Sequence, residues 1–422
     1  MSEKIQAIRG MIDLLPSESN LWLALEEIIN QLLISYGYKN CRTPIVENTE
    51  TFSRAIGEVT DLVEKEMYTW KDLSGESLTL RPEATAGIVR MMIEHNLPRE
   101  GIQKVFYLGP MFRHERPQKG RYRQFHQVDV EVFGAFDAKI DAELIDITDS
   151  LWKLIGINNV SLEINSLGSS ETRSSYRKLL QNYFLDNKTQ LDEDSIRRLT
   201  TNPLRILDSK NSEMESLIES APKMIDHLDD ESAEHFSVFK NYLDCLEIPY
   251  TINPRLVRGL DYYNRTVFEW ISNDLGAQGT ICGGGRYDGL VEKMGGNPTP
   301  AIGFAIGIER LILLIKGQRN KLQNSKSHLY FVSLGKKAQM ISMKLSRDIH
   351  AALPDIIITN DMSVGSLKSQ MKKADKSNAD FALILGEEEL SNNKISIKPL
   401  KGQADQQLIK LEGIIQHLQE IL

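Results

Sequence analysis

Apolar and polar positions follow helical spacing in the first segment of the chain. Leu21, Leu25 and Ile28 recur every three or four residues, a pattern typical of an amphipathic helix. It predicts a helix from about residue 17 to residue 36, followed by a short strand around residues 44–46. Considered alone, the segment is best explained as an ordinary core helix and edge strand.

The next segment alternates short apolar runs with turns. Two of these runs are the clearest predicted strands, Val105–Leu108 and Phe125–Val132. In the second run, Gln127, Asp129 and Glu131 occupy alternate positions, and alternate side chains of a strand share one face of a sheet. A row of polar side chains on a central strand is typical of a face that lines water or a ligand, so we expect this face to border a site.

Later segments differ in composition. Many polar and charged residues, with apolar residues at helical spacing, predict a small helical insertion, and glycine-rich strands resume after it. A polar linker over residues 316–327 precedes a β-α-β-α rhythm that is typical of a compact α/β domain. The predicted organisation therefore has four segments, 1–168, 169–249 (the insertion), 250–320 and 325–422.

The composition is that of an ordinary globular protein. A chain of 422 residues is too long for one core, so we expect two or three domains. No apolar run approaches the roughly 20 residues that cross a bilayer, and the first residues lack the apolar stretch of a secretion signal. Cys41, Cys245 and Cys282 lie too far apart for a zinc motif or a disulfide framework, which favours a cytoplasmic location. The net charge of −8 argues against general binding to DNA, although the segment from residue 325 onward is slightly basic.

Arginine carries the candidate chemistry. The chain has neither the Gly-x-x-x-x-Gly-Lys loop nor the Gly-x-Gly-x-x-Gly turn that bind nucleotides in other folds. Instead, five basic side chains lie between the two predicted strands: Arg113, Arg116, Lys119, Arg121 and Arg123. Guanidinium groups match phosphate oxygens in pairs, so this loop suits a triphosphate or a nucleic-acid end. A solvated loop tip is the alternative, because most runs of charge are solvated.

Three further segments combine glycines with basic residues: Leu256–Glu269, Cys282–Leu290 and Gly303–Leu311. The first contains Arg258 and the third contains Arg310. Consecutive glycines permit the close approach of two backbones, which is by itself no evidence of a site. Small residues in the third segment allow a strand to meet the following helix closely, and this places Arg310 in the first turns of that helix.

Together these segments resemble the class II aminoacyl-tRNA synthetases. The loop that Arg113 opens, with the strand after it, is similar to motif 2 of that class; the third segment is similar to motif 3, and the first helix and strand to motif 1. Leu256–Tyr263 and Gly284–Leu290 resemble the two peptides typical of histidyl-tRNA synthetases. Arg81–Gly87 resembles that family's amino-acid loop, with Ala84 where many relatives are expected to have glycine.

The resemblance covers essentially the whole chain and implies a fold and a reaction. The implied fold is α+β, with an antiparallel six-stranded sheet flanked by helices, a helical insertion and a C-terminal α/β anticodon-binding domain. Motif 1 implies a homodimer. The implied reaction activates L-histidine with ATP and transfers it to the 3' end of its tRNA. Mg²⁺ is expected on the phosphates of ATP, held by phosphate oxygens and water rather than by protein side chains.

The resemblance also implies roles for individual residues. Arg113, Arg258 and Arg310 would be catalytic because they surround the reacting phosphates. The implied ATP-binding residues are Arg113, Glu115, Arg121, Phe125 and Arg310. The implied histidine-binding residues are Glu83, Ala84, Thr85, Arg113, Gln127, Glu131, Arg258, Tyr262, Tyr263 and Tyr287. The implied tRNA-binding residues share one face of a predicted helix, with a solvated face as the alternative: Lys368, Lys372 and Lys376.

Three other interpretations have to be weighed against this one. A catalytically silent, synthetase-like regulatory subunit of histidine biosynthesis would keep the fold, but such chains typically lack the C-terminal domain and lose key arginines. A sister synthetase for another amino acid would lack the peptides around Arg258 and Gly284. A purely structural module would leave the arginines unexplained. We also expect the insertion to contact the tRNA acceptor stem, because it lies between catalytic segments.

Overall fold

The computed structural model describes residues 4–57, 60, 62–207, 209, 211–258, 260, 262–317, 326–363, 365–402 and 405–422. The chain divides into two compact units, Met1–Gln323 and Asn324–Leu422. The predicted linker over residues 316–327 falls mainly on residues 318–325, which lie outside the described residues. None of the helices in the described part of the chain combines the length and the apolar character that crossing a membrane requires.

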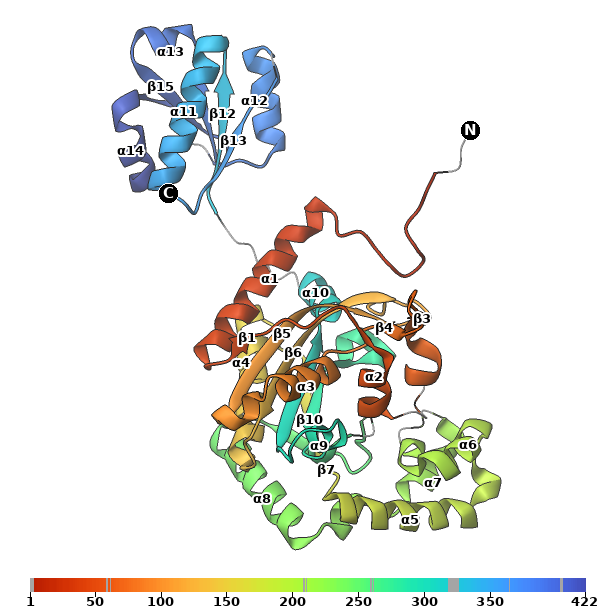
Figure 1. Cartoon of the computed structure of the whole chain (residues 1–422). Helices are drawn as coiled ribbons and strands as arrows, with labels where there is room; N and C mark the ends of the chain where they lie inside the picture. Colours follow the sequence, from red (N-terminus) through yellow and green to blue (C-terminus); the bar gives the residue numbers. More distant parts are fainter. Residues whose placement is uncertain are drawn as a thin grey trace. The chain divides into compact units, whose positions relative to one another are not determined.

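An eight-stranded sheet forms the centre of the first unit (Figure 1). Its strands, in spatial order, are β1 (Lys39–Asn40), β5 (Gln103–Phe112), β6 (Gln124–Phe133), β11 (Ala301–Gly307), β10 (Thr280–Arg286), β9 (Asn264–Ser272), β7 (Val160–Ser166) and β8 (Tyr250–Ile252). The six strands from β5 to β7 are antiparallel to their neighbours, as the resemblance implied. Beyond these six, the short strands β1 and β8 add parallel edges to the sheet.

Alternation along the strands gives this sheet two different faces. The even-numbered residues of β6, such as Val128 and Val130, join a large apolar core. That core also includes residues of α1 (Pro16–Ser35), α4 (Ala138–Ile155), α8 (Asp230–Cys245) and α10 (Ile308–Gly317). The predicted first helix is thus confirmed to within one residue at each end. The odd-numbered residues of β6 face the opposite side of the sheet, where the site lies.

The opposite side is covered by α2 (Thr49–Ile56), α3 (Thr85–Glu94) and α9 (Leu290–Lys293), and α2 also contacts a small sheet. The small sheet contains β2 (Val46–Asn48), β4 (Ser77–Leu80) and β3 (Tyr68–Lys71), in that spatial order. The strand predicted around residues 44–46 is therefore present but begins at the last of them. The side chain of Asn48 caps α2 by accepting a hydrogen bond from the Glu50 amide, which explains why β2 ends where the helix begins.

The segment predicted as a helical insertion contains α5 (Ser170–Asp186), α6 (Glu193–Thr201), α7 (Glu215–Glu219) and α8. The first three form a group (Figure 1). This group has its own apolar cluster, which includes Tyr176, Leu180 and Met214. Phe236 and Phe239 of α8 belong instead to the core under the main sheet. The self-contained part of the insertion therefore ends before α8.

The second unit is a five-stranded sheet with helices. Its strands, in spatial order, are β13 (Ile357–Asn360), β12 (His328–Ser333), β14 (Phe381–Leu385), β15 (Lys394–Pro399) and β16 (Gln407–Lys410). Its helices are α11 (Lys336–Ala352), α12 (Leu367–Lys376), α13 (Glu387–Ser391) and α14 (Ile414–Ile421). Strands β13, β12 and β14 are parallel to one another, whereas β15 is antiparallel to β14 and β16 is antiparallel to β15. The predicted α/β rhythm is therefore present, with β16 as an addition.

Candidate active site

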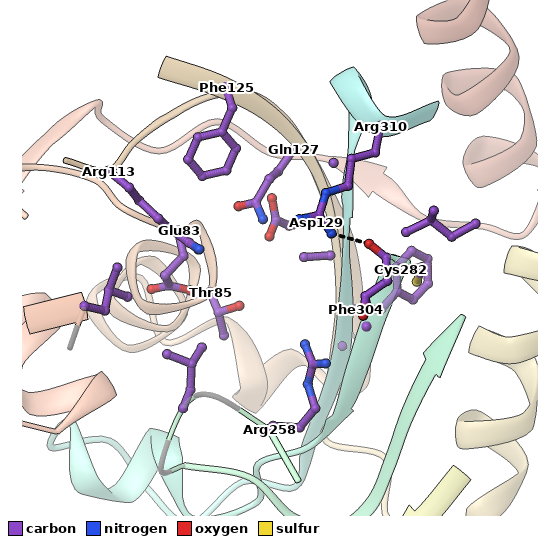
Figure 2. Close-up of a pocket in the computed structure, with 18 of the residues that line it drawn as sticks. Glu83, Thr85, Arg113, Phe125, Gln127, Asp129, Arg258, Cys282, Phe304 and Arg310 are labelled. Carbon is purple, nitrogen blue, oxygen red and sulfur yellow. Dashed lines mark hydrogen bonds between the residues drawn. The ribbon is translucent and has the colours of Figure 1, made fainter. Parts of the chain in front are cut away.

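A cavity of about 560 Å³ opens on the side of the main sheet to which the polar row of β6 projects. Gln127, Asp129 and Glu131 all line it, as the alternation predicted. Strands β10 and β11, the beginning of α3 and the loop between β5 and β6 complete its walls (Figure 2). Antiparallel pairing of β6 with β11 and of β11 with β10 therefore brings segments from both halves of the first unit into one site.

Most of the residues named from the sequence line this cavity: Glu83, Thr85, Arg113, Glu115, Arg121, Phe125, Gln127, Glu131, Arg258, Tyr262, Tyr263, Tyr287 and Arg310. Ala84 does not; its side chain is completely buried where α3 begins. Lys368, Lys372 and Lys376 lie in the second unit, exposed on α12.

Three arginines surround the open space from different sides (Figure 2). Arg113 follows β5, and its Nε donates a 2.8 Å hydrogen bond to the Pro82 carbonyl. Arg258 forms an ion pair with Glu269 of β9. Arg310, in the first turn of α10, donates to the Thr280 carbonyl. Each guanidinium is thus held by an anchor on the main chain or on another strand, which keeps it at the cavity.

The electrostatics favour an anionic ligand beside these arginines. Burial lowers the pKa of Arg310, and the guanidinium groups of Arg121 and Arg113 lower it further. Burial also lowers the pKa of Arg113. Cations that repel one another in a partly desolvated space are stabilised when an anion enters, so this part of the cavity is suited to phosphate groups.

Two of the buried carboxyl groups form a contrasting part of the cavity with tyrosines around them. Glu131 accepts a 2.6 Å hydrogen bond from the Thr85 hydroxyl and another from the Tyr287 hydroxyl. The Glu83 carboxylate accepts a 3.0 Å hydrogen bond from the Ala86 amide. Burial raises the pKa of Glu131 well above its usual range. The aromatic rings of Tyr262, Tyr263 and Tyr287 are in mutual contact, with centroids 4.7 to 6.4 Å apart.

Steric crowding explains why glycines occupy these positions of β10 and β11. A Cβ atom on Gly283 would lie 2.5 Å from the Arg258 guanidinium, and one on Gly303 would overlap the Glu131 carboxylate. Any side chain at these positions would displace a residue of the site. The glycine-rich strands are therefore the floor on which Arg258 and Glu131 lie.

Glu115 and Phe125, which the resemblance assigns to ATP, lie beside the arginines. The Glu115 carboxylate forms an ion pair with Arg121, and one of its oxygens is 3.8 Å from Arg113 Nη1. The Arg113 guanidinium lies 5.1 Å from the centroid of the Phe125 ring. These contacts keep the loop between β5 and β6 folded over the cavity.

Sequence reasoning placed Asp129 on the face of the cavity but assigned it no role, and it missed several other cavity residues: Glu66, Tyr122, Arg205, Thr280, Cys282 and Glu309. Asp129 carried a signal, since it belongs to the predicted polar row. Arg205 carried none, because it lies in the insertion, in a short helical turn at Pro203–Ile206. Glu309 accepts a 2.9 Å hydrogen bond from the His126 amide and so ties α10 to β6. Within the described residues, no group of three or more His, Cys, Asp or Glu side chains is arranged to hold a metal ion.

Comparison with known proteins connects this geometry to one family. A family profile described as histidyl-tRNA synthetase matches residues 10–311, and one described as an anticodon-binding domain matches residues 328–421. A histidine–tRNA ligase of Ruthia magnifica subsp. Calyptogena magnifica is 66% identical over 420 residues, covering 100% of both chains. One of Vesicomyosocius okutanii subsp. Calyptogena okutanii is 63% identical over the same length, again covering 100% of both chains. The crystal structure of apo S. aureus histidyl-tRNA synthetase has a TM-score of 0.82 and 36% identity, covering 98% of this chain and 99% of that one.

Proposed function

The chain belongs to the histidyl-tRNA synthetase family, and from this premise we propose how its cavity carries out the two steps of its reaction. The protein is an aminoacyl-tRNA ligase: it activates histidine with ATP as histidyl-adenylate and then transfers the histidine to tRNA. The observation that carries the assignment of roles is that a single cavity brings three arginines from distant segments together with buried carboxyl and tyrosine side chains.

The arginines act in the first step. A histidine carboxylate oxygen forms a bond to the α-phosphorus of ATP, and the bond from that phosphorus to pyrophosphate breaks. Arg113 contacts the α-phosphate and the carboxylate together, and Arg258 acts from the opposite side of the same phosphate. The three-sided arrangement of the guanidinium groups supports this role, because positioned cations offset the repulsion of two anions and the charge gained in the transition state.

The remaining ATP contacts follow from the same arrangement. Arg310 and Arg121 bind the outer phosphates, Phe125 stacks on adenine, and Glu115 orients the base. Mg²⁺ would enter with ATP rather than on protein side chains, and it would offset the negative charge of the phosphates. The carboxylate of Glu115 forms an ion pair with Arg121, and that of Glu309 accepts a hydrogen bond from the His126 amide. Both carboxylates are thus already engaged by protein groups, which supports a metal ion held by ATP rather than by these side chains.

Histidine occupies the part of the cavity that carries carboxyl groups. Its ammonium group is bound by Glu83, Thr85 and Gln127, and its imidazole lies between Glu131 and Tyr263. Tyr262 and Tyr287 shape the walls, and Ala84 supports the pocket from its buried position beside Glu83. A site that forms hydrogen bonds to both ring nitrogens discriminates against amino acids with side chains of similar size far better than an apolar pocket does.

The tRNA and a second copy of the chain contact other surfaces. We assign the anticodon to the second unit, with Lys368, Lys372 and Lys376 on phosphates, and the acceptor stem to the insertion. Arg205 supports the latter assignment, because it places a side chain of the insertion at the cavity. A homodimer is supported by exposed apolar side chains near the N-terminus, such as Ile5, Ile8 and Ile12. The cysteine usage fits the cytoplasm.

The regulatory-subunit alternative is less well supported. The chain matches ligases over their full length, keeps an anticodon-binding domain and retains the arginines of the cavity. The direct test of the proposed activation site is ATP–pyrophosphate exchange with each of the twenty amino acids and no tRNA. Exchange with histidine alone is expected. Exchange with another amino acid would overturn the pocket assignment, and no exchange from folded protein would favour the regulatory subunit.

A further inference from the structure

One buried carboxyl group in the cavity has no part in the roles assigned above. Asp129 lies on β6 between Gln127 and Glu131, on the face that lines the cavity, and its side chain is 1% exposed. Its Oδ2 atom has no hydrogen-bond partner among the described residues, and the same holds for Oε1 of Gln127. Figure 2 shows these two side chains next to each other, facing the open space.

Burying these two oxygen atoms without partners lowers the stability of the fold unless a ligand supplies a hydrogen-bond donor. A buried polar atom without a partner loses its hydration and gains nothing in return, and a buried carboxylate loses more. Burial and the nearby Glu83 carboxylate raise the pKa of Asp129 well above its usual range. A residue that served packing alone would not need an acid here, since its strand neighbours Val128 and Val130 fill the core with apolar side chains.

The neighbouring arginines do not satisfy Asp129. Arg81 donates hydrogen bonds to the carbonyls of Pro110 and Thr43, at 2.8 and 3.1 Å, and also contacts the Tyr107 hydroxyl. Arg113 donates from Nε to the Pro82 carbonyl. Both guanidinium groups are therefore held by other acceptors. They act on Asp129 through their positive charge, which favours its ionised form and so lowers its pKa.

The other two carboxyl groups of the pocket differ from Asp129. Glu131 is engaged by Thr85 and Tyr287, and Glu83 accepts from the amide of Ala86. Glu83, Arg81 and Arg113 act electrostatically on Asp129, and Asp129 in turn raises the pKa of Glu131. Asp129 thus lies between Gln127, which is assigned to the ammonium group, and Glu131, which is assigned to the ring, on one face of β6.

We propose that Asp129 is a further substrate-binding residue, whose carboxylate accepts a hydrogen bond from the α-ammonium group of histidine beside Gln127. The inference rests on the proposed assignment of this pocket to histidine. An ammonium group has three N–H donors, and Glu83, Gln127 and Asp129 supply three acceptors from two elements, the start of α3 and β6. The Thr85 hydroxyl donates its proton to Glu131, and the lone pairs of its oxygen can still accept from the ammonium group.

The test compares three ligands that differ by one group each. L-Histidine has the ammonium, carboxylate and imidazole groups; L-histidinol lacks the carboxylate, and 3-(imidazol-4-yl)propionate lacks the ammonium. Their affinities are measured by calorimetry with the full-length wild-type protein and with Asp129→Asn, which keeps the shape and removes the charge. We expect histidine and histidinol to bind about 10- to 100-fold more weakly to the variant, the range of one charge-assisted hydrogen bond, and imidazolylpropionate to bind within about twofold of wild type.

A second, matched variant separates a failure of the Asp129 contact from a failure of the assignment of this pocket to histidine. Glu83→Gln should weaken histidine and histidinol in the same selective way. If Asp129→Asn leaves histidine binding unchanged while Glu83→Gln weakens it, the Asp129 contact is refuted and the pocket assignment survives. If neither variant changes histidine binding, the pocket assignment itself fails. An equal loss for all three ligands with Asp129→Asn would mean that Asp129 only maintains the shape of the pocket, which also overturns the proposal.

Discussion

The hydroxyl group of Thr85 donates a 2.6 Å hydrogen bond to Glu131, joining the start of α3 to the second half of β6. The same carboxyl group also accepts a hydrogen bond from Tyr287, which directly follows β10. Three elements that are far apart in sequence therefore meet at one side chain. Because Glu131 is held from two directions, its position is set before the substrate arrives, which is the condition for selective recognition of an imidazole.

This arrangement predicts the effect of removing the Tyr287 hydroxyl. Tyr287→Phe keeps the ring but leaves Glu131 with one donor fewer, so we expect the KM for histidine in pyrophosphate exchange to rise about 10-fold, with the KM for ATP unchanged. Tyr183→Phe is the matched control, since its hydroxyl donates to the Leu217 carbonyl inside the insertion. A parallel rise of both KM values would show that Tyr287 stabilises the whole cavity instead.

A second prediction concerns Arg258. Arg258→Ala removes a guanidinium from one side of the α-phosphate, so single-turnover formation of histidyl-adenylate should slow by about 10²- to 10³-fold, while histidine still binds. Arg255→Ala serves as the control, because that arginine is more exposed and pairs with Glu219 of the insertion. Glu269→Gln should have a smaller effect in the same direction, since it releases the anchor of Arg258. Near-normal activation by Arg258→Ala would remove this residue from its proposed role.

A third prediction separates the insertion from the core. A deletion of the whole predicted insertion, residues 169–249, would remove α8, whose Phe236 and Phe239 support the main sheet. A shorter deletion is feasible, because Ser169 and Asp229 lie within hydrogen-bonding distance, 3.4 Å from amide to carboxylate. Replacing residues 171–227 with a short glycine linker should reduce tRNA charging much more than pyrophosphate exchange. Equal losses in the two assays would contradict the acceptor-stem role.

A fourth prediction tests the lysine face of α12. Lys368, Lys372 and Lys376 are exposed; Lys373 is also exposed but contacts Asp361 and Ser363. Changing Lys368, Lys372 and Lys376 to glutamine should weaken tRNA binding and make it less dependent on salt, with exchange activity unchanged. Lys336→Gln with Lys337→Gln on α11 is the control for a general loss of positive charge. An unchanged salt dependence would indicate that this face is only solvated.

A fifth prediction concerns stability and pH at the junction of α5 and α8. Although partial burial opposes its charge, hydrogen bonds from Thr172 and Ser232 hold the pKa of the Asp229 carboxyl well below its usual range. A carboxyl group with a depressed pKa stabilises the fold above its ordinary pKa of about 4, and this contribution is lost as the pH falls further.

Asp229→Ala should therefore lower stability at pH 7 by about 1 kcal/mol, the usual contribution of a helix cap. The difference from wild type in the urea midpoint should be the same at pH 7 and pH 5 and smaller at pH 3.5. Asp186→Ala, at an exposed position of α5, should show no such trend. A difference that does not change with pH would mean that the charge of Asp229 contributes nothing.

Local sequence patterns determined much of this protein. Helical periodicity located α1, and alternation on β6 correctly placed Gln127, Asp129 and Glu131 on one face, because both patterns depend only on the geometry of a single element. The motifs around Arg113, Arg258 and Arg310 identified the family, since the reaction needs cations around a phosphate and glycines that let them approach. The reaction itself could therefore be inferred without coordinates.

Only the tertiary structure decided which side chains meet. Strands β1 and β8 are two and three residues long, too short for a periodic signal, and their parallel pairing depends on neighbours far away in sequence. The helical pattern of α8 does not reveal which core it joins. Arg205 lines the cavity, and Oδ2 of Asp129 has no hydrogen-bond partner among the described residues, because of how separate elements pack. Register and packing are long-range properties, so no local pattern contains them.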